Sequence, residues 1–338
     1  MNSALVNTIS DRTEVSLSDK RKRKKLEREL GELYVLLQQD DVQEIFVNPD
    51  GCVWVDRAGQ ARARFGEMSE TARMTFLSSV ASSLNTYIDA SKPYIDGPLI
   101  LDGSRISGDI PPIVDAPSIR IRKHARLVRP LGWFVEKGTM SDEQQQTIRA
   151  ALVAKKNVVV VGSTAAGKTF LAKSLLSEIA QLAPADRILT IEDTPELVVE
   201  SEDALRWITS PTVDMQLMLR RALRATPDRI VVGEVRGAEA YQLLKMWNTG
   251  HSGGLCTIHS DQGATDGLTR LERMCAESSE TLGMGQAWIR ELVARVIDLL
   301  ILIERVNGER QVTGLVQVNG LTADGKGYDY QVLSRTHH

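Results

Sequence analysis

Cysteine and aromatic side chains are scarce in this sequence. Only three cysteines, Cys52, Cys256 and Cys275, occur among 338 residues. They are far apart and odd in number, which excludes a disulfide framework or a paired-cysteine metal site and fits a reducing compartment. Aromatic residues make up 5% of the chain, which argues against a single-stranded nucleic-acid binder built on stacking platforms.

Long apolar runs and an excess of one sign of charge are also missing. The longest apolar stretches, 158–161 and 296–303, fall far short of the roughly 18–20 residues that span a bilayer. The first 15 residues are polar and lack an apolar signal core. The formal net charge is -3, so no global positive field recruits nucleic acid. These absences predict a soluble, intracellular protein.

The rest of the composition, 42% apolar and 25% charged, is that of a globular chain of about two domains. The first 25 residues are predicted to form a flexible, basic segment. Residues 20–25 are six consecutive basic residues, and leucines at helical spacing follow from Leu26 to Leu37. The basic run is either the solvated start of an amphipathic helix or a segment attracted to an anionic lipid surface.

Residues 26–128 are predicted to form a small α+β domain. The turn residues Pro49-Asp50-Gly51 separate two alternating stretches and indicate a β-hairpin. A helical stretch follows around 71–84, and short strands broken by Gly and Pro run from 98 to 125. The periodic pattern lapses over residues 129–140, which are predicted to be a linker.

From Ser141 to the end of the chain, at residue 338, strands alternate with helices. Ser141 and Gln144 have the spacing of a capping box that opens the first helix. The predicted strands, with helices between them, are 157–161, 187–191, 229–232 and 255–258. This alternation predicts a parallel sheet with helices on both faces. Further strands are expected over 299–333, with turns at Asn319-Gly320 and Asp324-Gly325.

A phosphate-binding loop lies between the first of these strands and the helix after it. It is formed by Gly162, Ser163, Thr164, Ala165, Ala166, Gly167, Lys168 and Thr169. These residues match the pattern G-x-x-x-x-G-K-[ST], in which backbone N–H groups and a helix N-terminus converge on phosphate oxygens. Lys168 would neutralise the β- and γ-phosphates, and the Thr169 hydroxyl would hold Mg²⁺. The loop predicts a nucleoside triphosphate site, and the lack of an Asn-Lys-x-Asp stretch disfavours a GTPase.

Carboxylates follow the second strand of this series. Glu192, Asp193 and Glu196 lie just beyond the strand end, where ligands bind in open α/β sheets. Hydrolysis of a phosphoanhydride needs a group that orients the attacking water. Glu196 is the first choice for this base because Pro195 would hold it out from the strand end, and Glu192 is the second.

The third strand ends in a carboxylate and resembles a Walker-B element. Gly233 stands where an Asp is usual, so Glu234 is the only carboxylate there. Arg236 is either a local partner for Glu234 or a group that reaches a neighbouring subunit, and the local pair is favoured. The fourth strand ends at His259 on the expected nucleotide side of the sheet, where this side chain is a candidate sensor of the γ-phosphate.

Four ordered stretches, GSTAAGKT, TIEDTPEL, RIVVGEVRG and NTGHSGGLCTIHS, resemble the Walker A, Asp box, Walker B and His box of the secretion-ATPase superfamily. With LDGSRISGDIPP and SIRIRK upstream, the chain is most similar to the TrbB group of conjugative-transfer ATPases in type IV secretion systems. The resemblance covers about residues 26–320. It implies an α/β fold in which a RecA-like P-loop motor domain, 141–338, follows a smaller α+β N-terminal domain.

The resemblance also assigns roles to single residues. It places Lys168 and Thr169 on the phosphates and Mg²⁺, and it makes Glu196 the catalytic base. Glu234 becomes the Walker-B glutamate and His259 the His-box sensor.

Two arginines upstream of the motor domain, Arg105 and Arg122, match family arginines that reach the nucleotide. A guanidinium suits this task because its fork binds phosphate oxygens bidentately and stays charged. Judged from the sequence spacing alone, the favoured alternative is that both arginines form ion pairs with surface carboxylates. Phe170, directly after Thr169, completes the predicted nucleotide-binding set.

The resemblance therefore implies a hexameric, Mg²⁺-dependent ATPase, with ATP bound between two domains, that powers pilus biogenesis or substrate transfer in a conjugative type IV secretion system. The implied location is cytoplasmic and peripheral at the inner membrane. The implied partners are other copies of the chain, other secretion-system ATPases and inner-membrane channel subunits; no sequence-specific nucleic acid is expected. A nucleotide-gated assembly module and a type II secretion or type IV pilus motor are the alternatives. The pilus alternative is disfavoured because the sequence lacks the zinc-binding C-x-x-C pairs and the Ala-Ile-Arg-Ala-Gly stretch of such relatives.

Overall fold

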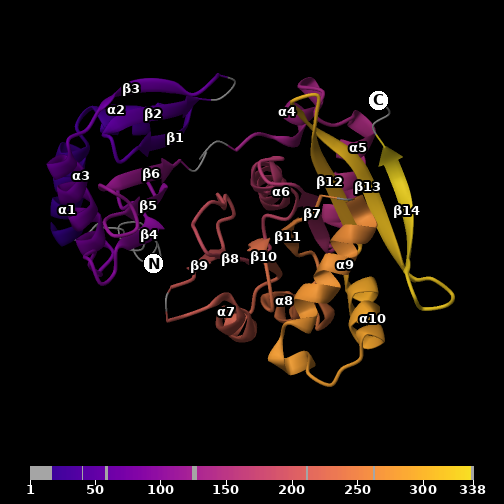
Figure 1. The fold of residues 1–338 in the computed structure, drawn as a ribbon. Coiled ribbons are helices and arrows are strands. Elements are labelled where there is room, and N and C mark those ends of the chain that lie inside the picture. The colour runs from indigo at the N-terminus through magenta and orange to yellow at the C-terminus, as the bar shows by residue number, and fades with distance from the viewer. Residues whose placement is uncertain are drawn as a thin grey trace, which may run out of the picture. The chain divides into compact units, whose positions relative to one another are not determined.

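The computed structural model describes residues 17–39, 41–57, 60–123, 128–210, 212–261 and 263–335. Contacts divide the chain into two compact units, Met1–Ala125 and Arg126–His338. Each unit has its own β-sheet (Figure 1). Within the described residues, no helix combines the length and the apolar character needed to cross a bilayer.

The N-terminal unit is built on an antiparallel sheet with strand order β3-β2-β1-β6-β5-β4. Its strands are β1 Val42–Val47, β2 Cys52–Arg57, β3 Ala63–Glu67, β4 Tyr94–Pro98, β5 Arg105–Asp109 and β6 Ser118–Arg122. Its helices are α1 Leu17–Leu30, α2 Glu32–Leu37 and α3 Glu70–Ser83. Alternation on the central strands sends Ile45 and Ile121 into a core shared with the helices, and it leaves Arg120 and Arg122 exposed.

The N-terminal helix differs from the prediction in where it begins and in being interrupted. The first 16 residues of the predicted flexible segment lie outside the described residues, whereas residues 17–25 form the first part of α1. The helix expected over 26–37 is interrupted at Gly31, whose φ of 54° breaks the run into α1 and α2. The predicted hairpin at Pro49-Asp50-Gly51 and the helix near 71–84 are confirmed.

The second unit is built on a mixed sheet with strand order β14-β13-β12-β7-β11-β10-β8-β9. Its strands are β7 Val158–Gly162, β8 Ile188–Glu192, β9 Ala204–Ile208, β10 Arg229–Val235, β11 Leu255–His259, β12 Leu299–Val306, β13 Glu309–Leu321 and β14 Tyr328–Arg335. The strands from β12 to β9 in this order are parallel, and β13 and β14 add an antiparallel edge. The predicted parallel sheet is confirmed.

Helices cover both faces of this sheet. They are α4 Leu131–Glu136, α5 Asp142–Val153, α6 Lys168–Leu182, α7 Met215–Ala222, α8 Glu239–Asn248, α9 Gly263–Ala276 and α10 Gln286–Val296, with short 3₁₀ turns at Leu223–Ala225 and Ser279–Thr281. Val159 and Val161 of β7 share a core with α7 to α10. Val158 and Val160 share the opposite core with α4, α5 and α6. A strand buried on both faces explains the run of four valines.

The segment 129–140 is not a linker, contrary to the prediction. It contains α4, which Pro130 precedes in an extended conformation. Leu131 and Phe134 are buried in the core beneath α5 and α6. The segment therefore belongs to the second unit, whose first helix precedes the predicted domain start at Ser141. The capping box of Ser141 and Gln144, which opens α5, is confirmed.

The turns of the C-terminal strands are also partly different from the prediction. Asn319-Gly320 lies within β13, where the pairing with β14 shifts register, so it forms a bulge and not a turn. The β12–β13 turn is at Asn307-Gly308, and both residues have positive φ. The predicted turn at Asp324-Gly325 is confirmed, between β13 and β14.

A buried ion pair stabilises the edge of the second unit away from the phosphate-binding loop. The Arg229 side chain is 1% exposed, and its Nε donates to Asp186 Oδ2 at 2.6 Å. Its Nη1 and Nη2 donate to the carbonyls of Gly253 and Leu152. Burial raises the pKa of Asp186, but hydrogen bonds from Arg229 and Lys155 outweigh it and hold this pKa below its ordinary value.

Replacing Arg229 with alanine is expected to lower the free energy of unfolding by about 3–5 kcal/mol, because Asp186 keeps only Lys155 as a partner and the carbonyls of Gly253 and Leu152 lose their donor. Urea unfolding measures this loss. The control is Arg295→Ala, an exposed arginine 3.9 Å from Glu291, which should cost less than about 1 kcal/mol. The Arg229 deficit should shrink as the pH falls from the ordinary carboxyl value of 3.8 through the lower pKa of folded Asp186, because Asp186 loses its charge over that range. Equal losses for the two variants would contradict this account.

Candidate nucleotide-binding site

The phosphate-binding loop connects the end of β7 to the start of α6. Gly162 must lack a side chain, because a Cβ there would lie 2.1 Å from the Ile303 carbonyl oxygen. Gly167 has a φ of 102° and immediately precedes α6. Ala165 also has a positive φ, 62°, so the loop turns tightly into the helix. The first N–H groups of α6 are free of intrahelical partners and are available to an anion.

Lys168 is the first residue of α6 and is buried. Its Nζ donates to the carbonyl oxygen of Ser163, 2.8 Å away, so the side chain lies back over the loop. Burial lowers the pKa of Lys168, and the charges of Glu234 and Asp261 oppose this shift. No described carboxylate is within ion-pair distance of Nζ, so its charge is available for phosphate.

Thr169 and Phe170 occupy the first turn of α6 and are both partly buried. The Phe170 ring packs against Phe134 and Trp133 of α4, at centroid distances of 5.4 and 5.7 Å. Its position in the first turn of α6 also gives Phe170 a backbone N–H that can be offered to a phosphate. The Thr169 hydroxyl is an oxygen ligand of the kind Mg²⁺ prefers. The described residues hold no group of three His, Cys, Asp or Glu side chains suited to a metal.

The two candidate bases have different surroundings. Glu192, at the end of β8, is 2% exposed, and its Oε1 accepts backbone N–H groups of Glu196 and Leu197 at 3.0 and 2.8 Å. Burial raises the pKa of Glu192, and these two donors oppose the shift. Glu196 is partly exposed. Glu192 thus holds the loop that presents Glu196.

Lys173 is a residue of this region that the sequence interpretation missed. It lies on α6 and is 2% exposed. Burial lowers the pKa of Lys173, and the charges of Glu196 and Glu192 oppose this shift. The signal in the sequence was a lysine among the leucines of a buried helix, between Leu171 and Leu175.

Glu234, near the end of β10, is paired locally. Arg236 Nε donates to Glu234 Oε2 at 2.8 Å, and Arg236 Nη1 lies 3.6 Å from Asp193 Oδ2. The favoured local pair is confirmed. Gly233 leaves room for the neighbouring strand, because a Cβ there would lie 3.1 Å from Glu192 Cγ. The glycine at the usual Asp position therefore accommodates the buried Glu192 side chain.

His259 ends β11 beside the loop. It is opposite Gly162 in the parallel register, and its Nδ1 lies 3.5 Å from the Thr164 hydroxyl. Its Nε2 is 3.7 Å from Asp261 Oδ2. The carboxyl ends of neighbouring parallel strands meet at one edge of a sheet. The strands β7, β8, β10 and β11 thus bring the loop, Glu192, Glu234 and His259 to the same edge.

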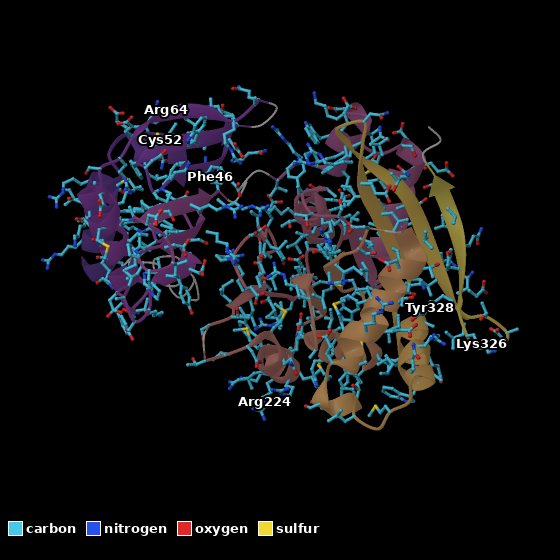
Figure 2. All side chains as sticks on the ribbon, viewed as in Figure 1. Phe46, Cys52, Arg64, Arg224, Lys326 and Tyr328 are labelled. Atoms are coloured by element: carbon cyan, nitrogen blue, oxygen red, sulfur yellow. The ribbon has the colours of Figure 1, made fainter. Side chains whose placement is uncertain are left out.

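The predicted arginines of the N-terminal unit lie together on its sheet. Arg105 of β5 and Arg122 of β6 are directly opposite in the antiparallel register, and both are exposed. Arg122 Nε is 3.6 Å from Glu44 Oε1. The same outer face carries Phe46, labelled in Figure 2, with the Arg120 guanidinium carbon 5.7 Å from its ring centroid. That Arg105 and Arg122 reach the nucleotide stays a prediction.

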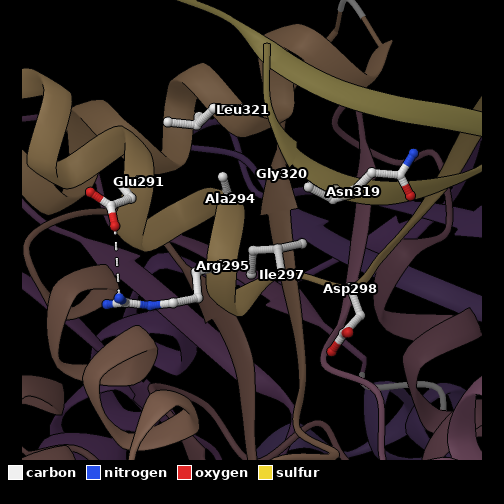
Figure 3. Close-up of a pocket in the computed structure, with 9 residues that line it drawn as sticks. Glu291, Ala294, Arg295, Ile297, Asp298, Asn319, Gly320 and Leu321 are labelled. Carbon is white, nitrogen blue, oxygen red and sulfur yellow. Dashed lines mark ion pairs between the residues drawn. The ribbon is translucent and has the colours of Figure 1, made fainter. Parts of the chain in front are cut away.

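A surface pocket of the second unit lies at the opposite edge of its sheet (Figure 3). It is lined by Glu291, Ala294, Arg295, Ile297, Asp298, Val318, Asn319, Gly320 and Leu321. Asp298 directly precedes β12, whereas Ile303, further along this strand, contacts Gly162 of the loop. This pocket is therefore distinct from the nucleotide site.

Residues 104–313 match the type II/IV secretion system protein family. The chain belongs to this family, and the resemblance to the secretion-ATPase superfamily is confirmed. The chain is 42% identical over 296 residues to a probable conjugal transfer protein TrbB of Sinorhizobium fredii, covering 87% of this chain and 89% of that protein. It is 30% identical over 325 residues to the type IV secretion system protein PtlH of Bordetella pertussis, covering 86% and 94%.

The fold is shared with solved secretion ATPases. The ATPase DotB of Yersinia pseudotuberculosis aligns with a TM-score of 0.62 at 17% identity, covering 89% of this chain and 80% of that one. The predicted fold class, a P-loop motor domain with a smaller α+β N-terminal domain, is confirmed by the two sheets and this likeness.

Proposed function

We propose that the protein is a Mg²⁺-dependent ATPase that works as a homohexamer in a conjugative type IV secretion system. One observation carries the proposal: a complete phosphate-binding loop shares a sheet edge with Glu234 and His259. The names of the relatives TrbB and PtlH support the secretion assignment. In this role, ATP hydrolysis powers pilus biogenesis or substrate transfer.

The residues of the site divide the work of hydrolysis. Lys168 and the N–H groups of the loop bind the β- and γ-phosphates. Thr169 would hold Mg²⁺, which would supply neutralisation of phosphate charge. Glu196 orients the attacking water, and Glu234 acts at the γ-phosphate end. His259 senses whether that phosphate is present.

Arginines of the N-terminal unit couple the nucleotide state to a domain movement. ATP draws Arg105 and Arg122 toward its phosphates, because guanidinium forks bind phosphate bidentately. Phosphate release frees both side chains and reopens the two units. Their adjacent positions in the β5–β6 register support a joint role.

The proposed setting is the cytoplasmic face of the inner membrane. The partners are other copies of the chain, other secretion-system ATPases and inner-membrane channel subunits. The basic residues 20–25 lie on α1, where they suit contact with an anionic lipid surface.

Steady-state ATP hydrolysis per subunit is expected to rise to a plateau as protein concentration rises, because a ring completes each site only after assembly. The measurement covers a wide concentration range with Mg²⁺ present. Particle size is determined at each concentration. Full activity in a particle of one subunit would contradict the ring. ATP binding without turnover at any concentration would favour the nucleotide-gated assembly module.

A further inference from the structure

The hairpin between β12 and β13 packs directly against the phosphate-binding loop. β12 runs parallel to β7, with Leu302 opposite Val161. The next residue, Ile303, therefore lies beside Gly162, close enough that its carbonyl oxygen excludes a Cβ there. Contact between the two segments is backbone to backbone, so the hairpin has a fixed position at the loop.

Arg310 lies over the end of the loop where α6 begins. A Cβ added to Gly167 would be 2.9 Å from Arg310 Cδ and 3.4 Å from Arg310 Nε. The guanidinium group is thus held beside the residue that precedes Lys168. At this point the first N–H groups of α6 and the positive end of its dipole face outward.

Strand alternation places a second arginine on the same face of the hairpin. Arg305 and Arg310 are opposite each other in the β12–β13 register. Ile303 and Val312, which share their face, are buried in the core with Ala166 of the loop. The two glutamates of the hairpin, Glu304 and Glu309, alternate with the arginines and are on the other face.

This arrangement gathers positive charge without a counter-charge. In the part of the chain that the structure describes, neither Arg305 nor Arg310 forms an ion pair. The Arg310 side chain is exposed overall, but partial burial of its guanidinium group and the nearby Arg305 lower its pKa, as expected for cations held close together. Lys168 and the N-terminus of α6 add to the same field. An anion at this position removes the repulsion.

The strand order indicates which part of a bound nucleotide would lie beside the β12–β13 hairpin. β11 and β12 flank β7 on opposite sides. His259 ends β11, and Glu234 is on β10 beyond it, so the γ-phosphate end points to that side. The α-phosphate and the nucleoside then extend toward β12 and its hairpin.

We propose that Arg310 is a nucleotide-binding residue that holds the α-phosphate end of the bound nucleotide, with Arg305 strengthening the local positive field. The proposal rests on the ATPase function proposed above. A guanidinium fork there binds two non-bridging oxygens that ATP and ADP share. Arg310 therefore retains the nucleotide both before and after hydrolysis.

The test is equilibrium binding of a fluorescent ADP analogue to the full chain, with ATP and ADP as competitors. Arg310→Gln keeps a side-chain stem over Gly167 and removes the charge. It should weaken ATP and ADP binding about tenfold or more, and by the same factor, because both lose a charge-assisted contact. Arg310→Lys should recover part of the affinity. The control is Arg224→Ala, which removes an exposed arginine in the 3₁₀ turn between α7 and β10 (Figure 2). This variant should bind like the wild type.

The possible results of the binding experiment distinguish the role of Arg310, its assignment to the α-phosphate and the proposed ATPase function. Wild-type affinity in Arg310→Gln, together with loss of binding in Lys168→Ala, would overturn the role of Arg310 and keep the ATPase. A loss confined to ATP would place Arg310 at the γ-phosphate and overturn the α-phosphate assignment. No nucleotide binding by the wild type would overturn the proposed function itself. Circular dichroism and thermal unfolding establish that each variant is folded.

Discussion

Alanine at Lys168 is expected to abolish ATP hydrolysis and to weaken ATP binding strongly. Lys168 Nζ already lies over the loop, where it donates to Ser163, and the loop offers no other lysine. Without this charge, the β- and γ-phosphate oxygens would lose the cation of the loop and would have only its backbone N–H groups and the helix dipole to replace it. A loss of at least 10²-fold in turnover is expected for a group that stabilises transition-state charge.

The measurement compares phosphate release and nucleotide affinity in Lys168→Ala and in a matched lysine variant. Lys326, in the β13–β14 turn, is exposed and lies far along the chain from the loop (Figure 2). Lys326→Ala removes the same charge and should retain wild-type turnover. Near-normal hydrolysis in Lys168→Ala would remove the assignment of the phosphate-binding loop. Equal losses in the two variants would point to a general effect of charge.

The sequence identifies the edge of the sheet that carries the candidate nucleotide-binding site because several local signals agree there. Four consecutive valines predict a doubly buried strand, and a complete glycine-rich pattern follows it. Glu192, Glu234 and His259 each come at the end of a further apolar stretch. Since parallel strands end at one edge, the strand ends alone were sufficient to bring these residues together.

Features that depend on tertiary packing were not predictable in the same way. The helix Leu131–Glu136 has six residues, too few for a periodic pattern, and its burial against α5 and α6 stabilises it. The strand Ala204–Ile208 was missed because it is a half-exposed edge strand without clear alternation. Asn319-Gly320 is a dipeptide typical of turns, but β13 continues past it in its pairing with β14, so the dipeptide forms a bulge.

Two residues of the candidate site, Arg310 and Lys173, could not be predicted from the sequence for the same reason. Arg310 is far from the loop in sequence and reaches it only because β12 is placed next to β7. No local pattern encodes that strand order. Lys173 was not singled out because the burial of its side chain depends on what α6 packs against. The sequence thus identified residues by motif and missed both Arg310, which the sheet order brings to the motif, and Lys173, whose burial depends on tertiary packing.

Replacing Glu196 with glutamine is expected to preserve ATP binding and to slow hydrolysis by about 10²- to 10⁴-fold, the range for loss of a general base. The structural argument is that the two glutamates of the segment at the end of β8 have different surroundings. Glu196 is partly exposed, and Glu192 is fixed by two backbone N–H groups. Binding of a fluorescent ATP analogue and single-turnover hydrolysis separate the two effects.

The matched variant is Glu192→Gln, which makes the same chemical change four residues away. An amide oxygen can still accept the N–H groups of Glu196 and Leu197, so the loop keeps its conformation. Burial raises the pKa of Glu192, so its charged form costs stability above the ordinary carboxyl range, and the neutral amide avoids this cost. Glu192→Gln should therefore fold as well as the wild type at neutral pH and retain most of its turnover. Bound but unhydrolysed ATP in Glu192→Gln, with normal turnover in Glu196→Gln, would transfer the role of the base to Glu192.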